Sequence, residues 1–135
     1  MPLTRPTLRR RITATGPRDA DDVWDRYERP ARWPEWAPQI RSVDYPGERI
    51  EPDTSGTVHG PAGLPVRFRI RHVDSSGPVR EWSWTASAAG VLLTLRHTVE
   101  PAPGGTRTGL TVEGLAPVVT LYLPVALWAL RRLVR

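Results

Sequence analysis

The 135-residue sequence contains no cysteine and no lysine. The absence of cysteine excludes a disulfide framework, a thiolate metal site and a cysteine nucleophile. The three histidines, His59, His72 and His97, are too far apart for the short spacings of zinc motifs. A G-x-S-x-G nucleophile elbow, a phosphate-binding glycine loop and a dinucleotide-binding fingerprint are also missing from the sequence. We therefore expect neither a metal ion nor a cofactor.

Because lysine is missing, all 19 basic residues are arginine, and the formal net charge is +5. The excess of positive charge lies at the two ends of the chain, in residues 5–11 and 131–135. Between them, 14 carboxylates outnumber 12 arginines. Nucleic-acid-binding proteins usually carry a basic patch on the body of the domain. We therefore expect no nucleic-acid partner.

A long uncharged stretch near the C-terminus runs from Leu115 to Leu130. It is shorter than the ~20 apolar residues that span a bilayer, and it contains two prolines. Residues 12–17, which follow an arginine triplet, do not form the apolar region of an export signal. We expect the C-terminal stretch to pack on the protein's own sheet, with no membrane contact and a cytoplasmic location. Contact of residues 116–135 with a membrane surface is the alternative.

The order of predicted elements indicates an α+β protein. Residues 1–7 contain two prolines and no periodic pattern, so we expect a flexible arm followed by a single domain over residues 8–135. A first strand is followed by a helix near residues 19–29, whose apolar stripe ends at Pro30, and by one short helical turn. Strands are predicted near residues 8–15, 40–49, 55–60, 65–74, 79–88, 91–100 and 106–114, with a final helix over residues 116–134.

Short, turn-rich links between the strands predict consecutive antiparallel hairpins and a seven-stranded sheet. The sheet must curve around the long C-terminal helix, because no other element can cover that helix. We expect Pro124 to bend or split this helix. A curved sheet over a helix leaves a hollow between them, and a ligand would bind in that hollow.

Several motifs resemble those of a known family. They are Ile12-x-Ala14, Pro17-x-Asp19-x-x-Asp22-Val23-Trp24, Arg29-Pro30-x-Arg32-Trp33-Pro34-Glu35-Trp36-x-Pro38, Gly56-Thr57, Leu95-Arg96-His97-Thr98-Val99-Glu100 and Gly104-Gly105-Thr106-Arg107. With this element order, the sequence resembles the START-like helix-grip superfamily, and within it the SRPBCC group of polyketide cyclases/dehydrases and lipid-transport proteins. The resemblance implies a helix-grip fold. It implies much less about activity, because members include aromatase/cyclases, lipid carriers and proteins of other roles.

Alternation along two strands predicts which side chains face the hollow. In residues 65–73, Phe68, Ile70 and His72 share one face, and three arginines share the other. In residues 91–100, Leu95 and His97 lie on the apolar face. Aromatase/cyclases resemble one another in a cavity arginine on a central strand, but alternation places Arg67, Arg69 and Arg71 in solvent. A one-residue bulge would reverse this assignment.

The two inward histidines are candidate general acids or bases, because histidine titrates near pH 6.5. A core histidine hydrogen-bonded within the protein is the alternative for each of them. Trp82 and Trp84 share one strand face and either form a stacking wall for a ligand or belong to the ordinary core. We expect Trp33 and Trp36 at the mouth of the hollow.

The leading hypothesis is a protein that encloses a hydrophobic small molecule, polyketide-like, aromatic or lipid, and catalyses its cyclisation or dehydration. In this hypothesis His97 or His72 moves the proton, Tyr122 assists, and ligand-binding residues surround the substrate. The candidate ligand-binding residues are Trp33, Trp36, Phe68, Ile70, Trp82, Trp84, Leu95 and Trp128. A non-catalytic carrier or sensor of lipids or metabolites is the alternative. The sequence leaves open whether the chain forms a homodimer.

Overall fold

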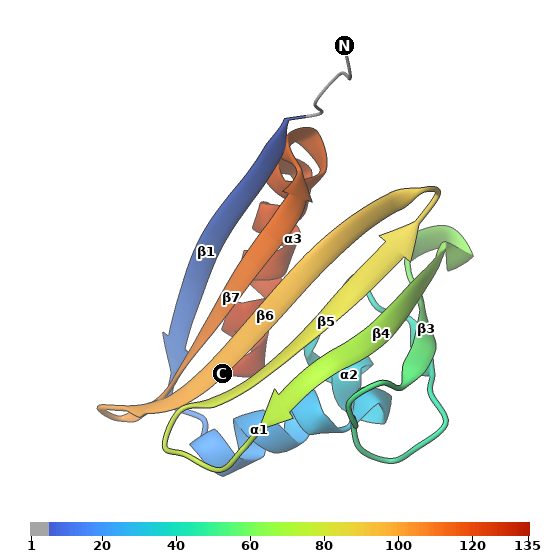
Figure 1. Ribbon diagram of the computed structural model, residues 1–135. Helices are drawn as coiled ribbons and strands as arrows, with labels where there is room; N and C mark the ends of the chain where they lie inside the picture. The colour runs from blue at the N-terminus through green and yellow to red at the C-terminus, as the bar shows by residue number, and fades with distance from the viewer. Residues whose placement is uncertain (1–5) are drawn as a thin grey trace.

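The computed structural model describes residues 6–135 as one antiparallel sheet covered on one side by helices (Figure 1). The sheet has seven strands in the order β1-β7-β6-β5-β4-β3-β2. In chain order, the elements are β1 (Thr7–Gly16), α1 (Ala20–Glu28), η1 (Pro30–Arg32), α2 (Trp33–Trp36), β2 (Ser42–Asp44), β3 (Ser55–His59), η2 (Pro61–Gly63), β4 (Pro65–Asp74), β5 (Arg80–Ala88), β6 (Val91–Ala102), β7 (Gly105–Leu115) and α3 (Ala116–Leu133).

This architecture confirms the predicted α+β fold and its antiparallel sheet. The largest difference between the prediction and the structure is the second strand, which was predicted near residues 40–49 but comprises only Ser42–Asp44. Pro46 lacks the N–H that a ladder hydrogen bond requires, and the chain turns away there. Of the arm predicted for residues 1–7, the first five residues lie outside the described part of the chain, and Thr7 already pairs with Leu115.

The sequence of α1 explains where this helix begins and ends. The side chain of Asp19 accepts a hydrogen bond from the backbone N–H of Asp21 and caps the first turn. Asp21 and Asp22 place negative charge beside the positive end of the helix dipole. Pro30 cannot continue the helix, because it has no N–H to donate to the carbonyl of Arg26.

Helix α3 lies over β1 and β7, toward one edge of the sheet (Figure 1). It is not split at Pro124, which occupies an exposed position within a single helix. By length and composition alone, α3 could cross a membrane. In this fold, however, one of its faces is buried on the sheet and on α2 and includes Val119, Ala126 and Leu130.

The C-terminal end of α3 is held by an arginine from α1. The guanidinium of Arg26 donates to the carbonyl of Leu133 at 2.9 Å and to that of Arg132 at 3.2 Å. Backbone carbonyls at a helix C-terminus have no partner within the helix, and cations there also favour the helix dipole. Arg26 is buried, so it satisfies these carbonyls where water has little access. This contact joins α1 to α3.

The strand β4 contains a bulge that changes which face its last residues occupy. Ile70 pairs with Trp84, but the next paired residue is His72, opposite Ser83, and Val73 lies opposite Trp82. Arg71 is the extra residue. Phe68 and Ile70 are therefore buried on the inner face of the sheet, as alternation predicts, whereas His72 faces outward.

Replacing Arg26 by methionine tests the contact between α1 and α3. Arg26→Met keeps much of the apolar stem but removes the donors for two buried carbonyls, so we expect a loss of about 1.5–3 kcal/mol in the free energy of unfolding. Urea denaturation measures the change. Arg29→Met is the matched control on the same helix, since Arg29 pairs with Asp25 at the surface, and it should cost less. Equal losses for the two variants would contradict the role assigned to Arg26.

Candidate ligand-binding pocket

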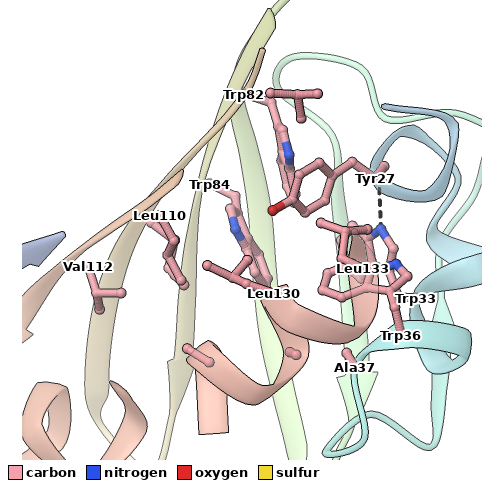
Figure 2. Close-up of a cluster of buried hydrophobic side chains, with 14 of the residues drawn as sticks. Tyr27, Trp33, Trp36, Ala37, Trp82, Trp84, Leu110, Val112, Leu130 and Leu133 are labelled. Carbon is pink, nitrogen blue, oxygen red and sulfur yellow. Dashed lines mark hydrogen bonds between the residues drawn. The ribbon is translucent and has the colours of Figure 1, made fainter. Parts of the chain in front are cut away.

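One end of the hollow is closed by an aromatic cluster, which comprises Tyr27, Trp33, Trp36, Phe68, Trp82 and Trp84. Figure 2 shows the tyrosine and the four tryptophans of this cluster. The indole N–H of Trp33 donates to the carbonyl of Tyr27 at 2.9 Å, and that of Trp36 donates to the carbonyl of Arg26 at 3.2 Å. These are carbonyls that Pro30 leaves without a helical partner at the end of α1. Trp33 and Trp36 are thus buried at the closed end, and their predicted place at the mouth is wrong.

His97 is buried against this cluster and has a partner on each ring nitrogen. Its Nε2 accepts a hydrogen bond from the indole of Trp84 at 2.9 Å, and its Nδ1 lies 3.1 Å from the hydroxyl of Tyr27. The imidazole also stacks on Trp82, with ring centroids 4.5 Å apart and planes at 9°.

The donors in this network determine the protonation of His97. Trp84 can only donate, so Nε2 must be the unprotonated nitrogen and Nδ1 carries the proton. Nδ1–H then donates to Tyr27, whose hydroxyl lies 2.9 Å from that of Thr108, and Thr108 donates to the carbonyl of Thr98 at 2.9 Å. Desolvation by burial lowers the pKa of His97 to about 3. His97 is therefore a neutral core histidine with both nitrogens occupied, which was the alternative to a catalytic role.

His72 does not reach the hollow. Because of the bulge, its side chain is 59% exposed on the outer face of the sheet, 3.8 Å from Glu81. The prediction that His72 faces inward is wrong, and the arrangement gives it no contact with a ligand in the hollow. The arginines Arg67 and Arg69 are exposed, as alternation indicated.

The other end of the hollow contains an apolar pocket of about 340 Å³, which we call the outer pocket. It lies on the helix-covered face of the sheet, between the ends of β3, β4, β5 and β6 and the first turns of α3. This is the end of the sheet away from α1, which Figure 1 shows. Its lining residues are Gln39, Ile40, Val58, Leu64, Val66, Trp84, Ala86, Ala88, Val91, Leu93, Leu95, Val118 and Tyr122. None of them is charged.

A much smaller recess of about 30 Å³, the inner recess, lies next to the outer pocket and is lined in part by the aromatic cluster. Gln39, Ile40, Trp84 and Tyr122 line both spaces. The inner recess has room for about one water molecule or one small polar group. Two buried polar atoms on its lining residues have no hydrogen-bond partner within residues 6–135, the amide oxygen of Gln39 and the indole nitrogen of Trp82.

Tyr122 is the one ionisable residue among those lining the outer pocket. Burial raises the pKa of its hydroxyl to about 12, and a hydrogen bond with the side chain of Gln39 acts in the opposite direction. At neutral pH the phenol is therefore protonated, and it can donate or accept a hydrogen bond but cannot serve as a base.

The structure brings only some of the predicted ligand-binding residues to the outer pocket. Trp84 and Leu95 line it. Trp33, Trp36 and Trp82 line the inner recess, whereas Phe68 and Ile70 are in the packed core and line neither space. Trp128 is 54% exposed on the outer side of α3, so its prediction as a lining residue is wrong. Because α3 is apolar on all sides, its sequence does not indicate which of its faces packs on the sheet and which is exposed.

The sequence reasoning missed Gln39 altogether. This residue follows Pro38 in the irregular segment between α2 and β2 and belongs to no periodic pattern. Alternation also predicts that Val66 and Leu93 share the inward faces of Phe68 and Leu95, but they were not among the candidate ligand-binding residues. Ala86 was missed, although the alternation of β5 places it on the same face as Trp84.

The protonation of His97 is testable by its pH dependence. Its folded pKa lies below the unfolded value of about 6.5, so only the unfolded chain takes up this proton as the pH falls toward 3. As the pH falls from about 6.5 to about 3, we expect His97 to lower the free energy of unfolding by about 1.4 kcal/mol per pH unit. Above pH 6.5, we expect no effect of His97 on the pH dependence of stability. Nitrogen NMR at pH 5 should still show a neutral ring protonated on Nδ1. An imidazolium at pH 5 would contradict the network.

Comparison with solved structures shows the same fold in proteins of very different sequence. The chain is similar to a hypothetical protein from Helicobacter pylori, with a TM-score of 0.76 and 13% identity over 97% of this chain and 87% of that one. It is similar to Ara h 8.0201, with a TM-score of 0.67 and 13% identity over 94% and 96% of the two chains. Protein Ms6760 from Mycobacterium smegmatis has a TM-score of 0.68 and 18% identity over 93% and 88%.

At the level of sequence, no curated protein gives a significant match. A family model described as polyketide cyclase/dehydrase and lipid transport matches residues 7–134, which is nearly the whole chain. The match agrees with the helix-grip architecture of the sheet and α3. The protein therefore belongs to the polyketide cyclase/dehydrase and lipid-transport family of the helix-grip superfamily.

Proposed function

We propose that the protein binds an uncharged hydrophobic small molecule in the outer pocket and acts as a carrier or sensor of it. The observation that carries the proposal is the lining of this pocket, which is apolar except for Gln39 and Tyr122 and contains no charged side chain. Membership of a family of polyketide cyclases/dehydrases and lipid-transport proteins supports a hydrophobic ligand in general. The volume of the outer pocket, about 340 Å³, lies at the lower end of the range of small-molecule binding sites.

The polar atoms at the base of the pocket support a ligand with one uncharged polar group at its inner end. The amide oxygen of Gln39 is buried and has no partner among the residues that the structure describes, so it can accept a hydrogen bond. The hydroxyl of Tyr122 can donate or accept one. A hydroxyl group in the inner recess would satisfy Gln39 while the apolar body of the ligand fills the outer pocket. A carboxylate there would be buried without a cation, which is costly.

The geometry favours the carrier over the cyclase or dehydratase. Proton transfer requires an acid or base within hydrogen-bond reach of the substrate, with a pKa near the working pH. Both nitrogens of His97 are occupied inside the core, His72 is outside the hollow, and Tyr122 remains protonated. Cyclisation of a polyketide-like ligand and the cytoplasmic location stay predictions from the sequence, which leaves open whether the chain forms a homodimer.

Filling the outer pocket should abolish ligand binding. Ala88 lines the pocket, and Ser87, its neighbour on β5, points to the opposite face of the sheet. Ala88→Trp should weaken binding of an uncharged naphthylamine dye by about tenfold or more, because the new indole occupies the ligand's volume. Ser87→Trp adds the same side chain outside the pocket and should leave dye fluorescence unchanged. Equal effects of the two variants would place the ligand elsewhere.

The uncharged lining also predicts selectivity between ligands of the same chain length. At pH 7 we expect decanol to displace the dye at a concentration about tenfold or more lower than decanoate, since only decanoate brings a charge into the pocket. Lowering the pH toward the pKa of the free carboxylic acid should narrow the difference. Decanoate binding as tightly as decanol at pH 7 would contradict the proposed ligand class.

A further inference from the structure

Three segments of the chain that contribute to the mouth of the outer pocket contain no charged residue. Residues 60–66, 82–95 and 114–130 contain no aspartate, glutamate, lysine or arginine. Leu64 from the first segment, Val91 from the second and Val118 from the third all line the pocket. These segments meet at the end of the sheet opposite α1 and α2 (Figure 1). We call this end of the molecule the open end.

Each of the three segments exposes a leucine at the open end. Leu64 is 51% exposed, Leu92 is 57% exposed and Leu121 is 78% exposed. Single exposed apolar residues are common on proteins, but a group of them beside a cavity mouth is typical of an interaction surface. Val79, which is 46% exposed, lies at the start of β5 at the opposite end and serves below as a comparison.

Exposed arginines without a carboxylate partner lie near the same end. Arg9 and Arg67 are near the first residues of β1 and β4, and Arg41 comes directly before β2. Within the described part of the chain, none of the three forms an ion pair.

At the closed end, three of the arginines are paired with acidic residues. Arg18 pairs with Asp22, and Arg80 pairs with Asp21. Arg32 pairs with Asp25 at 2.7 Å. Arg131, Arg132 and Arg135, at the C-terminal end of α3 beside Arg18 and Glu35, also form no ion pair within residues 6–135. The two ends of the molecule therefore differ in the exposed leucines around the pocket mouth rather than in unpaired positive charge.

We propose that the open end docks on the surface of a lipid bilayer that contains anionic lipids. The leucines would enter the boundary between headgroups and acyl chains, and the arginines would lie at the level of the phosphates. A second copy of the chain fits this surface less well, since a two-fold contact would bring the same unpaired arginines against each other. In the docked orientation the mouth of the outer pocket faces the bilayer, so an apolar ligand can pass between them without crossing water.

Vesicle co-sedimentation of the full chain tests the docking. We expect binding to vesicles of phosphatidylcholine mixed with phosphatidylglycerol and much weaker binding to phosphatidylcholine alone. Leu92→Ser/Leu121→Ser should lower the partition coefficient by about tenfold or more, because both leucines lose their insertion energy. Arg9→Gln, Arg41→Gln and Arg67→Gln should each lower it by about fivefold at low salt, with smaller effects at high salt.

Two controls separate docking from folding and from ligand binding. Val79→Ser removes a similarly exposed apolar residue at the closed end and should bind vesicles as the unchanged protein does. Neither Leu92 nor Leu121 lines the outer pocket, so the double variant should keep its circular dichroism spectrum and its affinity for the uncharged dye without vesicles. A failure of the proposed function would appear in that dye assay and leave vesicle binding intact.

Three results would overturn the docking. The first is that the unchanged protein does not bind anionic vesicles. The second is that the Leu92→Ser/Leu121→Ser and Val79→Ser variants bind equally well. The third is a dimer in sedimentation velocity that the double leucine variant disrupts while vesicle binding is absent, which would assign the open end to contact between copies of the chain.

Discussion

Two indole N–H groups close one end of the hollow, and the rest of the site depends on this closure. Pro30 ends α1 and leaves the carbonyls of Arg26 and Tyr27 without helical partners, and the indoles of Trp36 and Trp33 bind them. The requirement that buried carbonyls be hydrogen-bonded thereby draws two large rings beneath the sheet. Space that a ligand could have used is filled at this end, and the outer pocket is confined to the other.

The same closure determines the chemistry that is available. Tyr27 is held in the core by the packing of α1, and its hydroxyl links His97 to Thr108. His97 is thus part of a chain of satisfied hydrogen bonds in a dry interior, where charging it is unfavourable. A histidine in such a network stabilises the core and orients Trp84, whose ring then forms one wall of the outer pocket.

The placement of α3 at one side of the sheet gives the molecule two unlike ends. Because α3 covers β1 and β7, the far ends of β3, β4, β5 and β6 remain without a helix above them. Ion pairs gather around α1, where acidic residues stabilise its N-terminus and pair with arginines. The open end instead exposes three leucines, Leu64, Leu92 and Leu121, around the mouth of the outer pocket. The proposed binding of an apolar ligand and the proposed contact with a lipid surface both depend on this difference between the two ends, and neither requires a catalytic residue.

Patterns within single elements made most of the architecture predictable. Alternation along β4, β5 and β6, turn residues between strands, the Asp19 cap and Pro30 determined the strands, the helix α1 and the inward faces of Phe68, Trp84, Leu95 and His97. Family resemblance supplied the helix-grip arrangement. These features could be read from the sequence because strand and helix periods relate neighbouring residues to one another.

Only the tertiary structure decided the identity of the site. The bulge after Ile70 turned His72 outward. Trp33 and Trp36 are buried because their indoles bind the carbonyls that have no helical partner at the end of α1. Trp128 is exposed because α3 packs on β1 and β7 with its opposite face. Gln39 reached the pocket from a segment without any period. Each of these outcomes depends on contacts between residues far apart in the chain, where hydrogen-bond satisfaction and packing, rather than local periodicity, select the arrangement.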